Sequence, residues 1–320
     1  MIDRIQSKVF VIVVNYNQDQ YTVDCVNSLL ESDYENFQIC LIDNGSRDEV
    51  RENLERLLPA NDKLATHLLS KNLGYVGGVN YGLKEGEKVL ADYYLIMNND
   101  TLIGKHSITE LVACVKKHED LAIVSGKVFN YGEQDSLQYI GQAKDPKNGL
   151  NQVSLIKGRR EQDVGQFDQE MEMGMLDDIF WLFPKSLYKA NGGYSEYFYL
   201  YGEQNDYAFR ALKSGYKLIY TPTASLWHKG GVSTCDGDKT SPRIEYWKTF
   251  ATLKLAVLHL SEVEAKKFCS YWPKRKLIKI LVLIFKGELT WGHFKSVYTA
   301  NQNFKHWNAV RYHDNGYNPF

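Results

Sequence analysis

The sequence predicts an α/β protein with a mainly parallel central sheet flanked by helices and a C-terminal helical extension. Residues 9–14, VFVIVV, form an apolar run without alternation, which is typical of a strand covered on both faces. Residues 19–32 then carry apolar side chains at helical spacing, and alternating strands and helices indicate right-handed parallel crossovers. After residue 240 the composition shifts to long, aromatic and basic helical stretches.

The remaining elements of the first part follow in the order strand, helix, strand, glycine-rich turn and strand, at residues 37–43, 47–58, 65–70, 72–86 and 93–97. They complete a part that we place at residues 1–104. A second part, residues 105–240, is less regular. It carries a helix, a strand, a long loop or hairpin region, a further helix and a last strand, at residues 107–118, 122–129, 141–163, 204–214 and 217–222. We expect these two parts to form one domain, residues 1–240, and residues 241–320 to form the helical region.

Composition excludes several classes of protein. The formal net charge of -1 gives no overall attraction to nucleic acid. The five cysteines are scattered without a CxxC pair, which argues against a disulfide framework or a structural zinc site. The polar N-terminus lacks the apolar core of a signal peptide, and the longest apolar run, residues 277–285, is too short to span a bilayer. We therefore expect a cytoplasmic protein.

Polar residues follow four of the predicted strands. Asn15 ends the first strand, Asp43 the second, Lys71 and Asn72 follow the third, and Asp100 follows the fourth. Each alone is explained by turn chemistry. Because ligands of open α/β sheets bind beyond the carboxyl ends of the strands, four such groups on one rim predict a binding site.

The glycine-rich segment NLGYVGGVNYG has two interpretations. Gly77 and Gly78 permit a close backbone approach before an expected helix, as in a loop that cradles phosphate. A tight strand-to-helix turn explains them equally well. The spacing is neither that of a GxGxxG dinucleotide loop nor that of a P-loop, which disfavours both nucleotide folds.

Five blocks, in this order and spacing, resemble the conserved blocks of bacterial family-two glycosyltransferases: VVNYNQDQYTVDCVNSLL, LIDNGSRD, KNLGYVGGVNYGLKEG, YYLIMNND and YLYGEQNDYAFRALKSGYKLIYTPTASLWHKGGVST. The similarity is greatest to the rhamnosyl- and galactofuranosyl-transferase-like subgroup, which builds surface polysaccharides. It covers roughly residues 8–240. The resemblance implies a GT-A type nucleotide-sugar-binding fold.

The resemblance also implies a donor site. Asn15 and Asp43 match residues that hold the nucleoside of a sugar nucleotide, and Asn72, Gly74 and Gly78 match residues that line its diphosphate and ribose. With three further polar residues of the same rim, the expected nucleotide-sugar-binding set is Asn15, Asp43, Lys71, Asn72, Gly74, Gly78, Asn98 and Asn99.

A divalent metal site is the next implication. The segment NND occupies the place of the family's DxD signature, so that Asp100 matches its last aspartate and Asn98 replaces its first. His228 matches a late histidine that often binds the same metal, although packing against Trp227 would also explain it. Manganese or magnesium prefers carboxylate and phosphate oxygens and would stabilise the charge of a leaving diphosphate.

The block GEQND, residues 202–206, bears on the identity of the general base. Inverting transfer needs a carboxylate beside the acceptor hydroxyl. The family's usual carboxylate position is occupied by Gln204, so we assign Glu203 as the base and Asp206 as a structural or acceptor-orienting group. Asp177 and Asp178 depart from the family pattern. We interpret them as a solvated turn, with Asp178 as the rival base.

Residues 272–291 combine five basic residues with a dense apolar block and tryptophans at both edges. An interfacial helix near a lipid-linked acceptor has this pattern. Packing of the apolar block on the catalytic domain explains it slightly better, and a homodimer contact is a third interpretation.

Together these features predict an inverting glycosyltransferase that uses dTDP-rhamnose or a UDP-sugar. The acceptor would be a hydroxyl of a glycan or lipid-linked glycan in O-antigen or capsule synthesis, at the inner face of the cytoplasmic membrane. Two alternatives are a nucleotidyltransferase and a nucleotide-sugar-binding module with impaired catalysis. The first would need an early basic glycine-rich loop, which VVNYNQDQ lacks; the second is motivated by Gln204 and Asn98.

Overall fold

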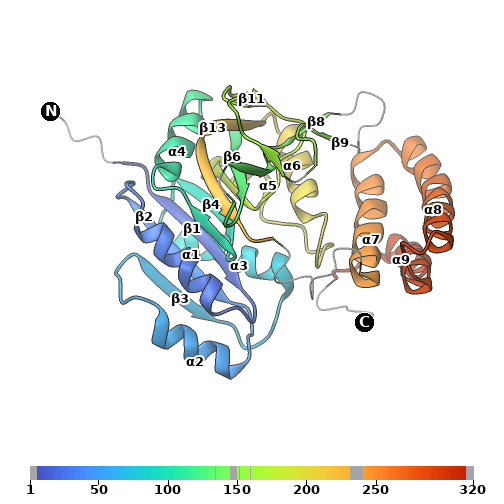
Figure 1. Ribbon diagram of the computed structural model, residues 1–320, viewed down its shortest axis with the longest axis horizontal. Coiled ribbons are helices and arrows are strands. Elements are labelled where there is room, and N and C mark those ends of the chain that lie inside the picture. Colours follow the sequence, from blue (N-terminus) through green and yellow to red (C-terminus); the bar gives the residue numbers. More distant parts are fainter. Residues whose placement is uncertain are drawn as a thin grey trace.

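The computed structural model describes residues 6–133, 135–144, 150, 152–158, 160–230 and 241–314. Within these ranges eleven strands form one mixed sheet with helices on both faces, and three long helices follow at the C-terminal end (Figure 1). The predicted α/β class is therefore confirmed.

Four parallel strands form the first half of the sheet in the order β4-β1-β2-β3. They are β1 (Val9–Asn15), β2 (Phe37–Asp43), β3 (Leu64–Leu68) and β4 (Tyr93–Asn98). The apolar runs of β1, β2 and β4 are almost wholly buried, as their lack of alternation predicts.

The second half of the sheet is mixed. β12 (Phe180–Pro184) pairs antiparallel with β4, whereas β6 (Ala122–Asn130) and β13 (Lys217–His228) pair in parallel. β13 also carries β5 (Thr101–Ile103), which directly follows β4 in the chain. The short strands of this half are β7 (Ser136–Tyr139), β8 (Gln142–Lys144), β9 (Gln152–Ser154), β10 (Glu161–Gln162) and β11 (Met171–Glu172). β8 and β9 form an antiparallel hairpin in the predicted loop or hairpin region, whose residues 145–149, 151 and 159 lie outside the described residues.

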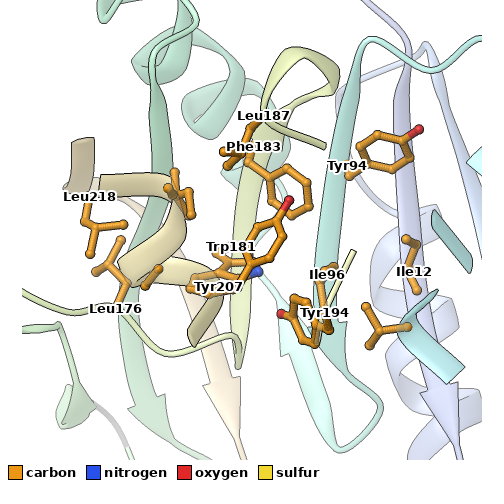
Figure 2. Packing of buried hydrophobic residues seen from close by; sticks show 14 of the residues in the cluster. Ile12, Tyr94, Ile96, Leu176, Trp181, Phe183, Leu187, Tyr194, Tyr207 and Leu218 are labelled. Atoms are coloured by element: carbon orange, nitrogen blue, oxygen red, sulfur yellow. The ribbon is translucent and has the colours of Figure 1, made fainter. Parts of the chain in front are cut away.

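Helices cover the two faces of the sheet. α1 (Gln20–Leu30) and α4 (Ser107–Lys117) pack on one face, and α3 (Gly74–Lys88), α5 (Lys185–Asn191) and α6 (Glu203–Lys213) on the other. α2 (Asp48–Leu57) contacts α1 beside the sheet. On the α3 side, alternate residues of β4 and β12 meet tyrosines from outside the sheet; Figure 2 shows Tyr94, Ile96, Trp181 and Phe183 among Tyr194 and Tyr207.

The connection that leaves β1 and the one that enters β4 create a crevice. α1, which follows β1, packs on one face of the sheet, whereas α3, which leads into β4, packs on the other. β1 and β4 are neighbours, so the chain leaves and enters this pair on opposite faces. Such a reversal opens a space at the carboxyl ends of the two strands.

Three C-terminal helices form a smaller aromatic core: α7 (Pro242–His259), α8 (Glu262–Phe285) and α9 (Trp291–Val310). Trp247, Trp307 and Tyr246 are its largest buried members, and α7 lies nearest the sheet (Figure 1). No helix in the described ranges is long and apolar enough to cross a membrane. The four cysteines in these ranges are free.

A buried ion pair joins α7 to the C-terminal end of the described chain. The Lys254 ammonium contacts the Asp314 carboxylate and also donates a hydrogen bond to the Tyr197 carbonyl oxygen at 2.5 Å. Both charged side chains are almost completely buried. Lys254 thus ties the helical region to the loop that precedes α6.

Removing one partner of this pair should destabilise the protein strongly. Burial lowers the pKa of Lys254 to about 6. At pH 5, below this value, Asp314→Ala leaves the Lys254 ammonium buried without its counter-charge, and we expect the free energy of unfolding to fall by roughly 3–5 kcal/mol in urea titrations. The exposed Lys266–Glu262 pair is the matched control, since Glu262→Ala should cost about 1 kcal/mol or less. Wild-type stability in Asp314→Ala would contradict the expectation; the apolar double variant Lys254→Met/Asp314→Leu should recover most of the loss.

Candidate functional site

A cavity of about 410 Å³ lies where β1 and β4 end, beside the N-terminus of α3. The loop before α6, the end of β13 and the first turn of α7 complete its walls. Seven of the predicted site residues line it: Asn72, Gly74, Asn98, Asn99, Asp100, Glu203 and His228. Asn15, Asp43, Lys71, Gly78 and Asp206 are not among the lining residues.

A buried polar network lies beneath the cavity. Asn15 donates a hydrogen bond to Asp43 Oδ2 at 3.0 Å and accepts one from the Asn99 amide at 3.1 Å. The Arg51 guanidinium donates to Asp43 Oδ1 at 3.0 Å, so the fully buried carboxylate is paired. These bonds hold the ends of β1, β2 and β4 together. A contact of Asn15 or Asp43 with a nucleoside stays a prediction.

Asn44 joins the ends of β2 and the glycine-rich turn. Its amide donates to the Gly74 carbonyl oxygen at 2.9 Å, and its side-chain oxygen accepts from the Leu73 backbone at 2.9 Å. It also donates to the Asn72 side chain at 3.1 Å. Asn44 lines the cavity itself, so the turn is supported from inside the site.

Gly74 and Gly78 have different structural roles. Gly74 has a φ of +76°, and a Cβ there would lie 2.7 Å from the Tyr199 ring, so glycine lets the loop before α6 approach the turn. A Cβ at Gly78 would lie 2.7 Å from Val14 Cγ1, so this glycine permits close packing of α3 on β1. Lys71 is exposed outside the cavity.

Asp100 and His228 face each other across the cavity floor. Their carboxylate oxygen and Nε2 are 3.3 Å apart, and both side chains are buried. Gln138 sets the tautomer of the imidazole: its amide donates to Asn130 and to the His228 carbonyl oxygen, so its Oε1 accepts from His228 Nδ1 at 2.6 Å. In the neutral ring Nε2 then presents a lone pair to Asp100.

This donor pair fits a divalent cation. Two ligand atoms of an octahedral magnesium-like ion lie roughly 3 Å apart, close to the separation of the Asp100 oxygen and His228 Nε2. Two facing lone pairs also repel each other unless a cation or a proton lies between them. Gln138 supplies the outer hydrogen bond that usually orients a metal-binding histidine.

A second cluster of possible metal ligands lies outside the cavity, on α4. Cys114, His118 and Glu170 bring their ligand atoms within 4.8 Å of one another. Lys117, however, already contacts both Glu170 oxygens at 3.1 Å, and burial raises the pKa of the Cys114 thiol to about 12. We interpret this cluster as an ion-paired end of α4.

Glu203 is held at the start of α6 by an unusual backbone. Tyr201 and Gly202 both have positive φ, +63° and +89°, which turns the chain abruptly into the helix. The Glu203 side chain is 4% exposed and lines the cavity, and its Oε2 has no hydrogen-bond partner in the described residues. The hydrogen-bonding capacity of this buried oxygen is therefore not used by the described residues.

Asp178 corrects the expectation of a solvated turn. It is 5% exposed, lines the cavity and accepts a hydrogen bond from the Tyr194 hydroxyl at 2.8 Å. Burial raises the pKa of Asp178 to about 7, and the charge of Asp177 adds to this rise. Burial and the charge of Asp178 also raise the pKa of Glu203 well above its usual value. The cavity therefore contains two interacting carboxyl groups whose burial favours their protonated forms.

Asp206 lies away from these groups. It accepts hydrogen bonds from Arg210 Nε and His259 Nε2, each at 2.8 Å, and so joins α6 to the end of α7. Burial alone would raise the pKa of Asp206, but these two partners outweigh burial and lower it. The geometry favours the structural role over the acceptor-orienting one.

Several lining residues escaped the sequence analysis. Arg243 reaches the cavity from the first turn of α7, and tyrosines line its walls: Tyr16, Tyr75, Tyr139, Tyr199 and Tyr201. The chain has 22 tyrosines, so a tyrosine alone marks no site, and the region after residue 240 has no motif that would mark Arg243. Four of these tyrosines lie in the blocks that resemble the glycosyltransferase family, and Tyr139 lies outside them.

Comparison with known proteins places this geometry in context. The model of a family described as Glycosyl transferase family 2 matches residues 10–190. Glycosyltransferase GlyG of Streptococcus pneumoniae serotype 4 is 27% identical over 129 residues, 40% of this chain and 42% of that protein. Poly-beta-1,6-N-acetyl-D-glucosamine synthase of Staphylococcus aureus is 23% identical over 186 residues, 53% of this chain and 44% of that protein. The chain thus spans less than half the length of both relatives.

A solved structure supports the fold. The crystal structure of GalNAc-T7 with UDP, GalNAc and Mn2+ matches 94% of this chain and 56% of its own with a TM-score of 0.62 at 13% identity. At this identity the likeness concerns the fold alone. It confirms the GT-A type architecture expected from the sequence.

The buried carboxyl pair should make stability depend on pH. A carboxyl whose folded pKa is raised from 3.8 to about 7 binds its proton more tightly in the native state, so stability is full below about pH 4 and falls as pH rises through 7. We expect a loss of a few kcal/mol in urea titrations between pH 4 and 8, at about 1.4 kcal/mol per pK unit. Asp178→Asn should reduce this loss markedly.

The exposed carboxylate Glu55 on α2 provides the control. Glu55→Gln should preserve the pH dependence of the wild type. If Asp178→Asn showed the same pH dependence as the wild type, the carboxyl of Asp178 would not be the proton-retaining group.

Proposed function

Because the chain belongs to glycosyl transferase family 2, we propose that it transfers a sugar from a nucleotide diphosphate sugar to an acceptor hydroxyl with inversion. One observation carries the proposal. A single cavity holds the facing pair Asp100 and His228 together with a buried carboxylate, Glu203, that has an unpartnered oxygen. Asp100 and His228 suit a diphosphate with its cation, and Glu203 suits a hydroxyl that must lose a proton.

The diphosphate end of the donor would lie beside Asp100 and His228. A bound manganese or magnesium ion would neutralise the charge that develops on the leaving diphosphate. Asp100 and His228 would hold such an ion, and Gln138 would keep the imidazole oriented. Asn98 and Asn99 add no charge here, so we expect weak metal binding without the nucleotide. The Mn2+ named with GalNAc-T7 supports a divalent metal in general.

Glu203 would act as the general base. The acceptor hydroxyl gives its proton to Glu203 Oε2 while its oxygen forms a bond to the anomeric carbon, and the bond from that carbon to the diphosphate oxygen breaks. The hydroxyl attacks opposite the leaving group, which inverts the anomeric centre. Burial raises the pKa of Glu203 well above the usual carboxyl value, which increases the proton affinity available to this step. Asp178 would assist by raising it.

The tyrosines suit the sugar rings, since aromatic faces pack against carbohydrate C–H groups while hydroxyls bind the rim. We propose dTDP-rhamnose or a UDP-sugar as donor and a glycan or lipid-linked glycan of bacterial surface polysaccharide as acceptor. The similarity to a poly-N-acetylglucosamine synthase supports a polysaccharide acceptor. A nucleotidyltransferase, the alternative considered from sequence, has no support in the family match.

A donor panel tests the proposal as a whole. Thermal stabilisation by nucleotide sugars with and without manganese identifies the donor, and release of the nucleoside diphosphate with glycan acceptors measures transfer. Donor binding without any turnover on a range of acceptors would favour the impaired binding module instead.

Loss of the metal-facing carboxylate should remove metal dependence. We expect Asp100→Ala to lower manganese-stimulated turnover at least about 100-fold and to abolish the extra thermal stabilisation that manganese gives to the nucleotide complex. Asp62→Ala, in an exposed loop before β3, should retain both. Unchanged metal dependence in Asp100→Ala would place the metal elsewhere.

Loss of the base should separate chemistry from binding. Glu203→Gln keeps the size of the side chain but cannot accept the proton, so turnover should fall about 10²–10⁴-fold while donor affinity stays near that of the wild type. The pH profile of wild-type turnover should rise with pH, because burial raises the pKa of Glu203 and the base acts only once it has lost its proton. Near-normal turnover in Glu203→Gln would shift the role to Asp178, whose Asn variant is the next measurement.

A further inference from the structure

The outward face of α8 is both apolar and basic. Ile278 is 61% exposed and Phe285 is 83% exposed, and Tyr271 and Val282 lie on the same side at helical spacing. Trp291, at the start of α9, is 62% exposed. Single exposed apolar residues are ordinary, but a helical stripe ending in an exposed phenylalanine and tryptophan is not. We call these five residues the α8 stripe.

This stripe is not a poorly packed core. The opposite side of α8 packs against the aromatic core of α7 and α9 through Cys269 and Trp272, and Ala265, Pro273 and Ile280 are buried. The α8 stripe therefore faces away from the protein, consistent with the outer position of the helix in Figure 1. No described residue covers Phe285.

Positive charge surrounds the α8 stripe. Residues 265–291 contain seven lysines and arginines and a single acidic residue, Glu288, within a chain whose net charge is -1. Lys266 and Lys276 are paired with Glu262 and Glu245. The other five are without an ion pair among the described residues, and all are exposed: Lys267, Lys274, Arg275, Lys279 and Lys286.

We propose that the α8 stripe and the five basic side chains without an ion pair dock the protein on an anionic lipid bilayer, with Phe285 and Trp291 inserted among the headgroups. The charges are complementary to acidic headgroups, whereas a second copy of the same face would set five cations against five. Aromatic and aliphatic side chains beside lysines are the composition of interfacial helices. α7, which packs on α8, also supplies Arg243 to the cavity, so docking would set how the cavity faces the bilayer.

Vesicle sedimentation tests the proposal on the full chain, without donor or acceptor, and so independently of the proposed sugar transfer. The protein should pellet with vesicles of phosphatidylcholine and phosphatidylglycerol at 70:30, pellet far less with phosphatidylcholine alone, and be released as salt rises to 0.5 M. Failure to pellet with the anionic vesicles would overturn the proposal.

Two variants separate the charges from the apolar stripe. The triple variant Lys274→Glu/Arg275→Glu/Lys279→Glu should weaken partitioning at least about 100-fold, because each lost cation costs about fivefold. Phe285→Ser should weaken it by a smaller factor that is independent of salt. Unchanged partitioning of the triple variant would overturn the proposal.

A matched charge reversal controls for net charge. Lys84→Glu/Lys105→Glu/Lys189→Glu removes three exposed lysines outside the helical region and should retain most of the binding. Equal losses in both triple variants would show a non-specific charge effect and overturn the proposal. Sedimentation velocity tests the alternative of a dimer contact. If Phe285→Ser converts a dimer to a monomer and the wild type does not bind anionic vesicles, the α8 stripe is a dimer interface and the proposal is wrong.

Discussion

The parallel pairing of β1 with β2 on one side and with β4 on the other is the constraint on which the candidate site depends. Because α1 and α3 pack on opposite faces of the sheet, the connections that contain them leave a space at the carboxyl ends of β1 and β4. Hydrogen bonds of Asn15 with Asp43 and Asn99 then hold the ends of β1, β2 and β4 together. The cavity is thus a consequence of connection order, and its chemistry comes from the loops that reach it.

Two electrostatic environments share this cavity. At one side Asp100 and His228 present electron pairs to each other and require a positive partner. At the other, Asp178 and Glu203 are buried close enough to favour their protonated forms. A polyanionic donor with its cation suits the first environment, and a neutral hydroxyl suits the second. In the proposed reaction, Asp100 and His228 would bind the charged diphosphate with its cation, and Glu203 would take the proton of the hydroxyl.

The predictable part of the fold is the part buried on both faces. β1, β2 and β4 have continuous apolar runs because helices cover them twice, and the sequence pattern states this directly. The antiparallel insertion of β12 beside β4 has no such signature, since a buried strand looks alike in either direction. The placement of Asp100 and His228 in one cavity followed from motif order, although 128 positions separate them in the sequence.

The acceptor side was harder to predict for a physical reason. A pair of aspartates at a turn is usually solvated, and the burial of Asp178 depends on Tyr194 and other side chains that arrive from distant segments. Asp206 stands in a motif position that suggests chemistry, yet Arg210 and His259 occupy both its oxygens. Its role became visible only once α7 was in place. α7 likewise makes the C-terminal helices part of the cavity. It supplies Arg243 to the cavity wall, and its last residue, His259, makes a hydrogen bond to Asp206 on α6. An exchange of residues 241–320 with those of another chain would therefore replace a residue of the cavity wall and the contact between His259 and Asp206 together.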